Sequence, residues 1–466
     1  MGTGWTGPEW LLIIERELLL FAGVFFLLGA LDELAVDLTW FWLRITGRAK
    51  SGRVETAPMR AAPLRGRAAV FIPCWREERV IAHTLRHALA AWPQDGLQFY
   101  VGVYPNDPAS LRAIEEGAGG DDRVRIVTIG HPGPTTKADC LSALYRAMEA
   151  DERMAGEAVR MIVLQDAEDM VHPAALGVLD SLMDEAEFVQ LPVIPLPQGG
   201  RRWIGSHYVE EFAEAHAKAM VVRDAIGSSL PAAGVGCAFS RPMLARLAEA
   251  AGQDTPFDEA SLTEDYELGL RVAEHGGRSR FVRLRDENGR LIGTRAFFPS
   301  SLARSVRQKA RWMNGIALHG WDRMGWRSGA AEMWMRLRDR RGPLSALVLL
   351  AGYTLLVLAV IGVSLRQQGF GGGLELDGLM LVLLYANLAS FAWRALMRLA
   401  FTAREHGLAE GLLAVLRIPV ANVINIMAGL RALWSYGRQL RGAAVLWDKT
   451  DHDDHPLGAA TQPVAR

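Results

Sequence analysis

Hydrophobic residues are spread unevenly along this chain. Long runs of Leu, Val, Ala and Phe occupy both ends, whereas residues from about 55 to 340 alternate apolar and polar positions. Mixed alternation is typical of a soluble domain, and an apolar run of about 20 residues is long enough to cross a bilayer. The pattern therefore predicts a soluble domain that is held to a membrane by apolar segments on either side.

The first apolar segment, Leu18 to Leu43, is interrupted by three acidic residues, Asp32, Glu33 and Asp37. No basic cluster precedes it, and several basic residues follow it: Arg44, Arg48, Lys50 and Arg53. A signal peptide carries its positive charge first, and positive charge stays on the cytoplasmic side of a membrane. We therefore interpret residues 1–54 as an uncleaved anchor whose C-terminal side faces the cytoplasm.

Two apolar segments near the other end, Leu344 to Leu365 and Leu379 to Phe401, are each long enough to span a hydrocarbon core. The loop between them contains one basic residue, Arg366, whereas Arg394, Arg398 and Arg404 gather at the end of the second segment. The distribution of positive charge predicts that the loop lies outside the cell and that both flanks are cytoplasmic.

A fourth apolar segment, Leu412 to Trp434, leaves two interpretations open. It contains four residues that are costly at the centre of a bilayer: Arg417, Pro419, Asn422 and Asn425. We prefer a helix that lies in the membrane interface, so that residues 341–434 hold two crossings and residues 435–466 form a cytoplasmic tail. If the segment crosses instead, the basic residues after it lie outside.

Within residues 55–300, apolar runs alternate with helical patterns. Runs that read as buried strands cover residues 68–73, 98–104, 124–129 and 160–165, and amphipathic stretches around 78–92, 109–116 and 137–150 read as helices. This alternation predicts an α/β domain with a mostly parallel sheet and helices on both faces. Ligands of such domains bind beyond the carboxyl ends of the strands.

Polar residues follow three of these strands, in "PCWREE" (73–78), "YPNDP" (104–108) and "QDAEDMVHP" (165–173). The last stretch brings Asp166, Glu168 and Asp169 within four positions, and such carboxylates repel one another unless a positive charge lies between them. Mg²⁺ or Mn²⁺, which prefer oxygen ligands, would supply that charge. The alternative is a polar turn that caps a helix.

Composition and missing motifs exclude several classes of function. The net charge is only −1, which does not predict a nucleic-acid partner. The three cysteines lack CxxC spacing, so no zinc site is expected. No GxGxxG follows the first strand and no GxxxxGK[ST] occurs, so neither a Rossmann dinucleotide site nor a P-loop is supported.

Two later stretches could approach a ligand. The small residues of "GVGCAFSR" (234–241) would let the backbone come close to a sugar. In "SLTEDYELG" (261–269), Thr263 could cap a helix that begins at Glu264.

The stretch "RQKARW" (307–312) opens a basic amphipathic region, residues 301–340. On a helix, Gln308, Arg311 and Trp312 share one face because they are spaced i, i+3, i+4. One interpretation is a helix lying on the membrane surface. The other is a binding face made of these three residues, with Arg304, Arg307 and Lys309 facing lipid or solvent.

In chain order, "PCWRE", Asp107, "DAED", "TED" and "QKARW" resemble the motif series of family 2 inverting glycosyltransferases of the cellulose and hyaluronan synthase kind, over residues 66–315. The stretches "VYPNDP", "GPTTKADCL" and "PAAGVGCAFSR" are similar to the inner-membrane phage-adsorption protein B group of these enzymes. The closing "WDKTDH" (447–452) agrees with the resemblance. One departure is that the family's Asp-x-Asp reads Asp166-Ala-Glu168.

The resemblance implies a GT-A-like fold, a nucleotide-sugar donor, in the first place a UDP-sugar, and a Mg²⁺ or Mn²⁺ ion. It implies that Asp265 is the general base and that Asp166 and Glu168 bind the metal. The implied donor-binding residues are Trp75, Glu77, Asp107, Lys137, Asp166, Gln308 and Arg311. The implied acceptor-binding residues are Thr263, Glu264 and Trp312.

The resemblance also implies a multi-pass protein of the bacterial inner membrane that extends a polysaccharide on its cytoplasmic face. With three crossings expected, a complete export channel would need an oligomer or a partner protein. Two alternatives remain: a transferase that adds one sugar to a lipid-linked acceptor, and a non-catalytic receptor or secretion component that keeps the fold.

Overall fold

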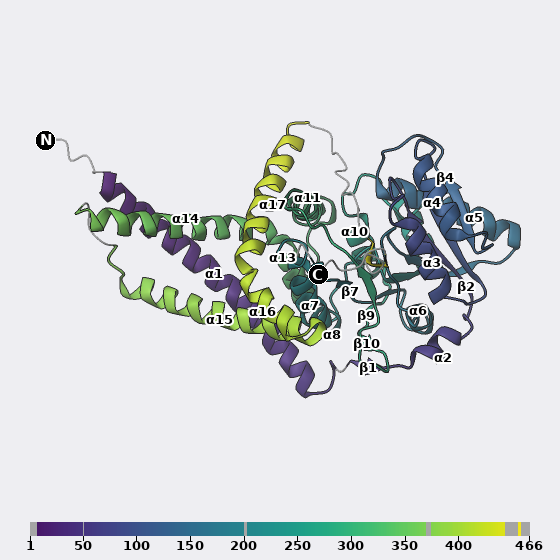
Figure 1. Cartoon of the computed structure of the whole chain (residues 1–466), viewed down its shortest axis with the longest axis horizontal. Coiled ribbons are helices and arrows are strands. Elements are labelled where there is room, and N and C mark those ends of the chain that lie inside the picture. The colour runs from purple at the N-terminus through teal and green to yellow at the C-terminus, as the bar shows by residue number, and fades with distance from the viewer. Residues whose placement is uncertain (1–6, 50, 200–202, 370–373, 443–454, 458–466) are drawn as a thin grey trace.

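The structure is a computed structural model that describes residues 7–49, 51–199, 203–369, 374–442 and 455–457. It consists of a globular α/β part and an arm of long helices that projects from it (Figure 1). The "WDKTDH" motif, residues 447–452, lies outside the described residues, as does most of the predicted tail.

A seven-stranded sheet forms the centre of the globular part, in the order β4-β3-β2-β5-β8-β6-β9. All neighbouring strands are parallel except that β8 runs antiparallel to β5 and β6. The strands are β2 (Arg67–Pro73), β3 (Leu97–Val103), β4 (Val124–Thr128), β5 (Val159–Leu164), β6 (Phe188–Gln190), β8 (Cys237–Ser240) and β9 (Ser279–Phe281). The predicted mostly parallel sheet is confirmed, and its four predicted strands are β2 to β5.

Two smaller parallel pairs lie beside this sheet. The first pair joins β1 (Gly52–Arg53) to β10 (Leu284–Arg285), and the second joins β7 (Val193–Pro195) to β11 (Thr294–Ala296). The pattern of the sequence did not predict these short strands.

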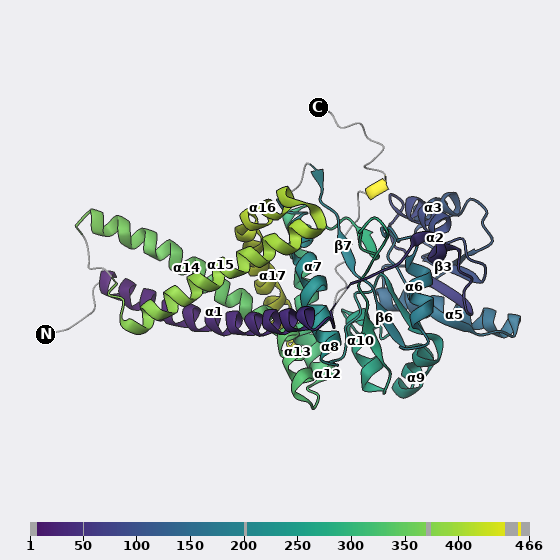
Figure 2. The same ribbon diagram turned by 90° about the horizontal axis from the view of Figure 1, so that it is seen from below.

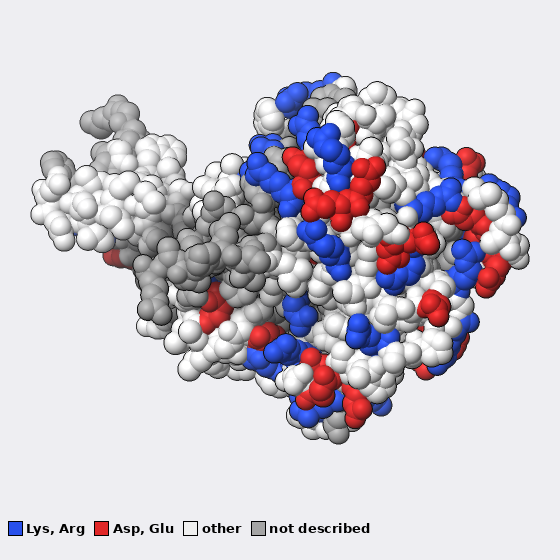
Figure 3. Space-filling view, turned by 45° about the vertical axis from the view of Figure 1, so that its right-hand side comes forward, with Lys and Arg blue, Asp and Glu red and all other residues white. Residues whose placement is uncertain are grey.

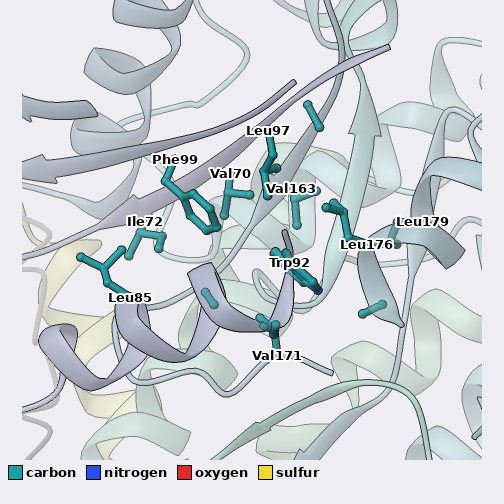
Figure 4. Packing of buried hydrophobic residues seen from close by; sticks show 14 of the residues in the cluster. Val70, Ile72, Leu85, Trp92, Leu97, Phe99, Val163, Val171, Leu176 and Leu179 are labelled. Carbon is teal, nitrogen blue, oxygen red and sulfur yellow. The ribbon is translucent and has the colours of Figure 1, made fainter. Parts of the chain in front are cut away.

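Helices cover both faces of the sheet, because alternate residues of each strand point to opposite faces. On one face Val70 and Ile72 pack against Trp92, Phe99 and the helices α2 (Thr56–Ala61), α3 (Ile81–Ala91), α4 (Pro108–Ala118) and α6 (Ala175–Leu182) (Figure 4). On the other face Phe71 belongs to a cluster that includes residues of α5 (Lys137–Ala155), α9 (Arg241–Ala251) and α10 (Glu264–Glu274). The expected two-faced packing is therefore confirmed.

The projecting arm contains α1 (Gly7–Ile45), α14 (Gly342–Gln367) and α15 (Gly378–His406), and α1 packs against both of the others (Figures 1 and 2). Within the described residues, three helices are long and apolar enough to cross a membrane: α14, α15 and α17 (Ile418–Gln439). The two segments predicted between residues 344 and 401 coincide with α14 and α15. Figure 3 shows charged side chains over the globular part and few on the described part of the arm.

The acidic residues inside α1 contact cations of other elements. Asp32 accepts hydrogen bonds from the guanidinium groups of Arg338 and Arg341, which lie at the end of α13 (Ala330–Arg340) and directly after it. Asp37 pairs with the ammonium group of Lys218 in the π-helix η2 (Ala215–Ala219). These carboxylates therefore join the arm to the globular part.

The fourth apolar segment forms two helices, α16 (Leu408–Leu416) and α17, with Arg417 between them. The buried Arg417 guanidinium lies 2.9 Å from carboxylate oxygens of both Glu210 and Glu410. Figure 1 shows α17 running across the direction of α14, beside α11 (Leu302–Met313). Arg417, one of the polar residues that made this segment ambiguous, is thus neutralised by protein carboxylates.

The prediction that Lys309 faces lipid or solvent was wrong. Lys309 is buried, and its ammonium group lies 2.5 Å from Glu211 Oε2 and 3.0 Å from Asn425 Oδ1 of α17. A charged group in that position needs both partners because burial without them is costly.

The remaining described helices are α7 (His207–Glu214), α8 (Met220–Ala225), η3 (Asn314–His319) and α12 (Gly320–Met324).

Candidate active site

The parallel neighbours β3, β2 and β5 end at the same edge of the sheet, and the polar residues that follow them meet there. A cavity of about 100 Å³ lies at this edge, next to α5 and α11. Seven of the predicted site residues line it: Trp75, Glu77, Lys137, Asp166, Glu168, Gln308 and Arg311. Residues separated by more than 230 positions in the chain thus border one small space.

The turn after β5 separates the roles of its three acidic residues. Asp169 is buried, and its Oδ2 accepts a hydrogen bond of 2.7 Å from the backbone N–H of Asp166. Burial, together with the charges of Asp166 and Glu168, raises the pKa of Asp169 well above its ordinary value. Asp169 therefore holds the turn, while Asp166 and Glu168 border the cavity.

Lys137 is the first residue of α5, and the hydroxyl of Thr136 caps this helix by accepting from Asp139 N at 3.2 Å. The Lys137 ammonium donates to Asp166 Oδ1 at 2.5 Å. Burial alone lowers the pKa of this lysine, but the nearby carboxylates of Asp166, Glu264 and Asp265 outweigh it and raise the pKa. Lys137 thus stays cationic and can attract a phosphate group.

Asp265 lies in the first turn of α10 and is oriented by the backbone N–H of Tyr266, which donates to its Oδ1 at 2.7 Å. A Cβ atom on Gly234, whose φ is +74°, would lie 2.3 Å from Asp265 Oδ2 and 3.2 Å from Lys137 Nζ. The small-residue stretch 234–241 therefore makes room for this carboxylate. Burial raises the pKa of Asp265, and Lys137 opposes that shift.

The two residues before Asp265 were expected to bind acceptor. Burial and the charge of Asp265 raise the pKa of Glu264 to about 7. Thr263 precedes the helix as predicted, but its side chain makes no capping hydrogen bond. Its buried hydroxyl oxygen has no hydrogen-bond partner among the described residues and lies close to Gly315 of η3. The Thr263 hydroxyl therefore does not cap the helix, although the sequence suggested that role.

Gln308 and Arg311, which share one face of α11 with Trp312, border the cavity. Buried Gln308 Oε1 and Arg311 Nε have no hydrogen-bond partner within the described part of the chain. The half-buried Trp312 does not line the cavity but lies among three aromatic rings, with centroid distances of 6.0 to 6.4 Å to Tyr208, Phe212 and Phe298. The helix thus offers polar groups to the cavity and an aromatic face beside it.

Asp107 does not line the cavity. Its carboxylate accepts from the backbone N–H of Arg76 at 2.5 Å and from Ser110 N at 3.2 Å, which caps α4. Because Arg76 has a φ of +55°, Asp107 holds a residue in a backbone region that costs energy. The structure therefore gives Asp107 a positioning contact beside Trp75, and its donor-binding role stays a prediction.

Sequence reasoning missed Tyr104, which lines the cavity at the end of β3. Its ring packs edge-on against Trp75 at a centroid distance of 5.3 Å. A Cβ on Gly133 would lie 2.9 to 3.0 Å from atoms of both rings, so a glycine is needed there. The predicted strand, residues 98–104, included Tyr104, whereas β3 ends at Val103 and leaves Tyr104 among the residues that follow the strand.

The donor atoms suit a divalent metal that is shared with a ligand. Within the described residues, no group of three or more His, Cys, Asp or Glu side chains is arranged to hold an ion. Mg²⁺ is commonly held by only one or two carboxylates, with phosphate oxygens and water completing its coordination. The carboxylates of Asp166 and Glu168, which border one cavity beside a cationic Lys137, fit that kind of shared site.

Comparison with solved structures agrees with the observed fold. The mannosyltransferase PcManGT from Pyrobaculum calidifontis, solved with GDP-Man and Mn²⁺, matches with a TM-score of 0.54 over 91% of this chain and 99% of its own. The two sequences are 14% identical, so this likeness concerns the GT-A fold alone.

Comparison with sequences gives a closer relation. Bacteriophage adsorption protein B of Escherichia coli K12 and bacteriophage N4 adsorption protein B of E. coli O157:H7 are each 32% identical over 95% of this chain. The chain spans 63% of the length of these relatives. The model of the family described as "Glycosyltransferase like family 2" matches residues 66–315, more than half of the sequence. The chain therefore belongs to the family 2 glycosyltransferases.

Proposed function

We propose that the protein is a membrane-bound inverting glycosyltransferase that moves a hexosyl or N-acetylhexosaminyl group from a nucleotide sugar to a growing polysaccharide. The observation that carries the proposal is the single cavity bordered by Lys137, Arg311, Asp166 and Glu168, with Asp265 beside Lys137. Transfer from a diphosphate requires cations for the phosphates, carboxylates for a metal and a separate carboxylate as base, and the half-buried Asp265 can serve as that base.

Donor binding follows from the charges around the cavity. Lys137 and Arg311 attract the diphosphate, and the planar guanidinium of Arg311 can donate two hydrogen bonds to it. Trp75 and Tyr104 provide aromatic surfaces for the nucleoside. Asp166 and Glu168 would hold Mg²⁺ or Mn²⁺, which offsets the negative charge that develops on the leaving group. A UDP-sugar remains our first choice of donor, and the GDP-Man in the related fold makes GDP-sugars the necessary comparison.

In the transfer step, the acceptor hydroxyl oxygen forms a bond to the anomeric carbon from the face opposite the nucleotide. The bond between that carbon and the diphosphate oxygen breaks, and the nucleoside diphosphate leaves with the electron pair. Asp265 accepts the proton of the hydroxyl, for which its raised pKa makes it a stronger base than an ordinary aspartate. Single displacement inverts the anomeric configuration.

Incubation of the purified full chain with a panel of UDP- and GDP-sugars, with Mg²⁺ or Mn²⁺, tests this proposal. We expect divalent-dependent release of one nucleotide, and a ladder of products by mass spectrometry. No nucleotide release with any donor would contradict the enzyme and favour the alternative of a receptor or secretion component, with which the names of the two phage-adsorption relatives agree.

A second candidate is a single transfer to a lipid-linked acceptor. It is favoured by the small number of helices, three within the described residues, that are apolar and long enough to cross a membrane. The same mass measurement separates the two functions, because a single product of donor plus acceptor replaces the ladder. Growth of a ladder would instead require export through an oligomer or a partner protein.

We also propose that the globular part and the C-terminal tail face the cytoplasm of the inner membrane, and that α17 lies in the interface. Three contacts support the α17 assignment, since Arg417, Asn422 and Asn425 bond to protein groups. Reporter fusions after Gly373 and after Arg466 should report the outside and the inside of the cell, respectively. A C-terminus outside would mean that α17 crosses.

A further inference from the structure

A cavity of about 950 Å³, much larger than the candidate active site, lies where α1 meets the globular part. It is bordered by the end of α1, by η2 and α8, and by the stretch from the end of α10 to β10. None of the residues that line the candidate active site line this cavity. Its volume is at the upper end of the range of ordinary small-molecule sites, about 300 to 1,000 Å³.

Arginine dominates the charged residues that line this cavity. Arg44 and Arg48 come from the end of α1 and the turn after it, and Arg404 comes from the last turn of α15. Three more arginines come from the stretch between α10 and β10: Arg278, Arg280 and Arg283. These six residues come from three separate stretches of the sequence, so the fold itself gathers their charges.

The carboxylates nearby do not balance these charges. Among the described residues, Asp224 is the one acidic residue that lines the cavity, and it lies 3.5 Å from Arg280. Glu405, at the end of α15, is shared by three arginines, with distances of 2.5 Å to Arg283, 2.5 Å to Arg285 and 3.9 Å to Arg404. The excess of cations in a concave surface concentrates a positive potential there.

Arg283 is the most buried of these arginines, with 8% of its side chain exposed. Its Nη1 donates to Ser51 Oγ at 3.0 Å, whereas its Nε has no hydrogen-bond partner among the described residues. Burial lowers the pKa of Arg283 to about 10, and the neighbouring Arg285 and Arg404 add to that effect. An anion beside this group would relieve both the burial cost and the repulsion.

The position of the cavity is close to the expected surface of the membrane. Residues near the C-terminal ends of α1 and α15 line it, and these two helices belong to the projecting arm shown in Figures 1 and 2. Trp40 borders it and donates to the backbone oxygen of Ala217 at 2.9 Å, and Arg48 lies 5.1 Å from the ring centroid of Trp42. Tryptophan and arginine at helix ends are typical of the bilayer interface, where lipid phosphates lie.

We propose that this cavity is a second phosphate-binding site, separate from the donor site, for a phosphate carried by an anionic phospholipid or by a free phosphate ester. Guanidinium groups suit this ligand because each can donate two parallel hydrogen bonds to phosphate oxygens. The binding makes no use of the catalytic residues, so the proposal stands whether or not the transferase assignment holds.

The test is calorimetry on the full chain, purified in a neutral detergent, with two probes. One probe is dihexanoyl phosphatidylglycerol below its micelle concentration, and the other is inorganic phosphate. The exposed Arg48 and Arg278 are replaced together, as Arg48→Gln with Arg278→Gln. The matched control is Arg112→Gln with Arg153→Gln, which removes two exposed arginines from elsewhere in the globular part.

We expect the cavity variant to bind at least one probe about tenfold more weakly than the wild type, and the control to bind normally, with equal unfolding temperatures for both variants. Loss confined to the lipid probe assigns the site to a membrane phospholipid, and loss with inorganic phosphate assigns it to a soluble phosphate ester. Equal affinity in the wild type and the cavity variant would overturn the proposal. Equal loss in both variants would also overturn it, because net charge alone would then explain binding.

Discussion

Two lysines in this protein lie among carboxylates, and their surroundings differ. Lys218 has a side chain that is 2% exposed and meets Asp37, Glu214 and Glu33, the last at 3.6 Å. Lys137 has a side chain that is 16% exposed, pairs with Asp166 and borders the candidate active site. Both clusters unite distant parts of the chain, since the first joins α1 to η2 and the second joins the start of α5 to the end of β5.

The two clusters differ in whether protein groups fill the space around the lysine and its carboxylates. Around Lys218, the indole of Trp393 also donates to Asp37, at 2.8 Å, so protein groups converge on the same carboxylate. Around Lys137, a cavity remains, and Arg311 Nε and Gln308 Oε1 lack hydrogen-bond partners within the described residues. A cluster of buried charges is therefore not by itself a site, because the structural cluster and the candidate site share that property. The free space beside Lys137 distinguishes them.

The largest effect that we expect comes from Asp265→Asn. Asparagine keeps the size of the side chain but cannot accept the hydroxyl proton, so transfer should fall by on the order of 100- to 10,000-fold. Donor affinity, measured by calorimetry, should stay within error of the wild type. The matched control is Glu264→Gln. If Glu264 binds the acceptor, loss of one hydrogen bond to it should lower transfer roughly fivefold. Full transfer activity in Asp265→Asn would remove the general-base assignment.

Replacing the two lysines tests the comparison itself. Lys218→Met removes the cation that donates to buried Asp37 and leaves this carboxylate with Arg394 at 4.0 Å, which should destabilise the protein by about 3 to 5 kcal/mol. Its thermal unfolding midpoint should fall while the KM for donor stays normal. Lys137→Met should instead weaken donor binding, because its charge faces the ligand. A normal unfolding temperature for Lys218→Met, or normal donor affinity for Lys137→Met, would show that the clusters do not differ as described.

The sequence predicted the sheet and most of the site because both depend on local patterns. Strand periods and the polar residues that follow each strand indicated Asp166 and Glu168, and the resemblance to family 2 glycosyltransferases added Trp75 and Glu77. The antiparallel β8 escaped prediction, because period and composition do not specify strand direction. Asp107 shows another limit, since only the positive φ of Arg76 reveals what its carboxylate holds.

Contacts between residues that are far apart in the sequence explain the remaining differences between prediction and structure. The environment of Lys309 could not be predicted, because its partners Glu211 and Asn425 are 98 and 116 positions away. The acidic residues within α1 interrupt an apolar run when only local sequence is considered, yet Arg338 and Arg341 neutralise two of them. The local sequence therefore indicates which charged residues are unusual for their segment. Only the fold shows whether they bind one another or a ligand.

A smaller effect is expected at the aromatic face of α11. Trp312→Ala should weaken acceptor use or shorten products, with a loss of about 1 to 3 kcal/mol, the range for aromatic stacking on planar bases. Donor affinity should remain, because Trp312 does not line the cavity. Trp321→Ala, which changes an exposed tryptophan of α12, is the matched control. Loss of donor affinity in Trp312→Ala would indicate that Trp312 has a structural role and does not bind the acceptor.

The smallest effect concerns pH. Asp265 must be unprotonated to accept the hydroxyl proton, so transfer should rise with pH through the pKa of the acidic pair Glu264 and Asp265. Because burial raises both pKa values, the acid limb should lie above the ordinary aspartate value of 3.8. A profile of transfer rate from pH 4 to pH 9 measures this limb. Constant activity across that range would contradict a buried carboxylate as base.

The most direct test of the central claim is donor affinity with and without Mn²⁺ in three variants. Asp166→Ala and Glu168→Ala should abolish the increase in affinity that Mn²⁺ causes in the wild type, because these carboxylates border the cavity. Asp169→Asn should retain it, since asparagine can still accept the hydrogen bond from Asp166 N. The claim is contradicted if Asp166→Ala and Glu168→Ala respond to Mn²⁺ like the wild type, or if Asp169→Asn alone loses the response.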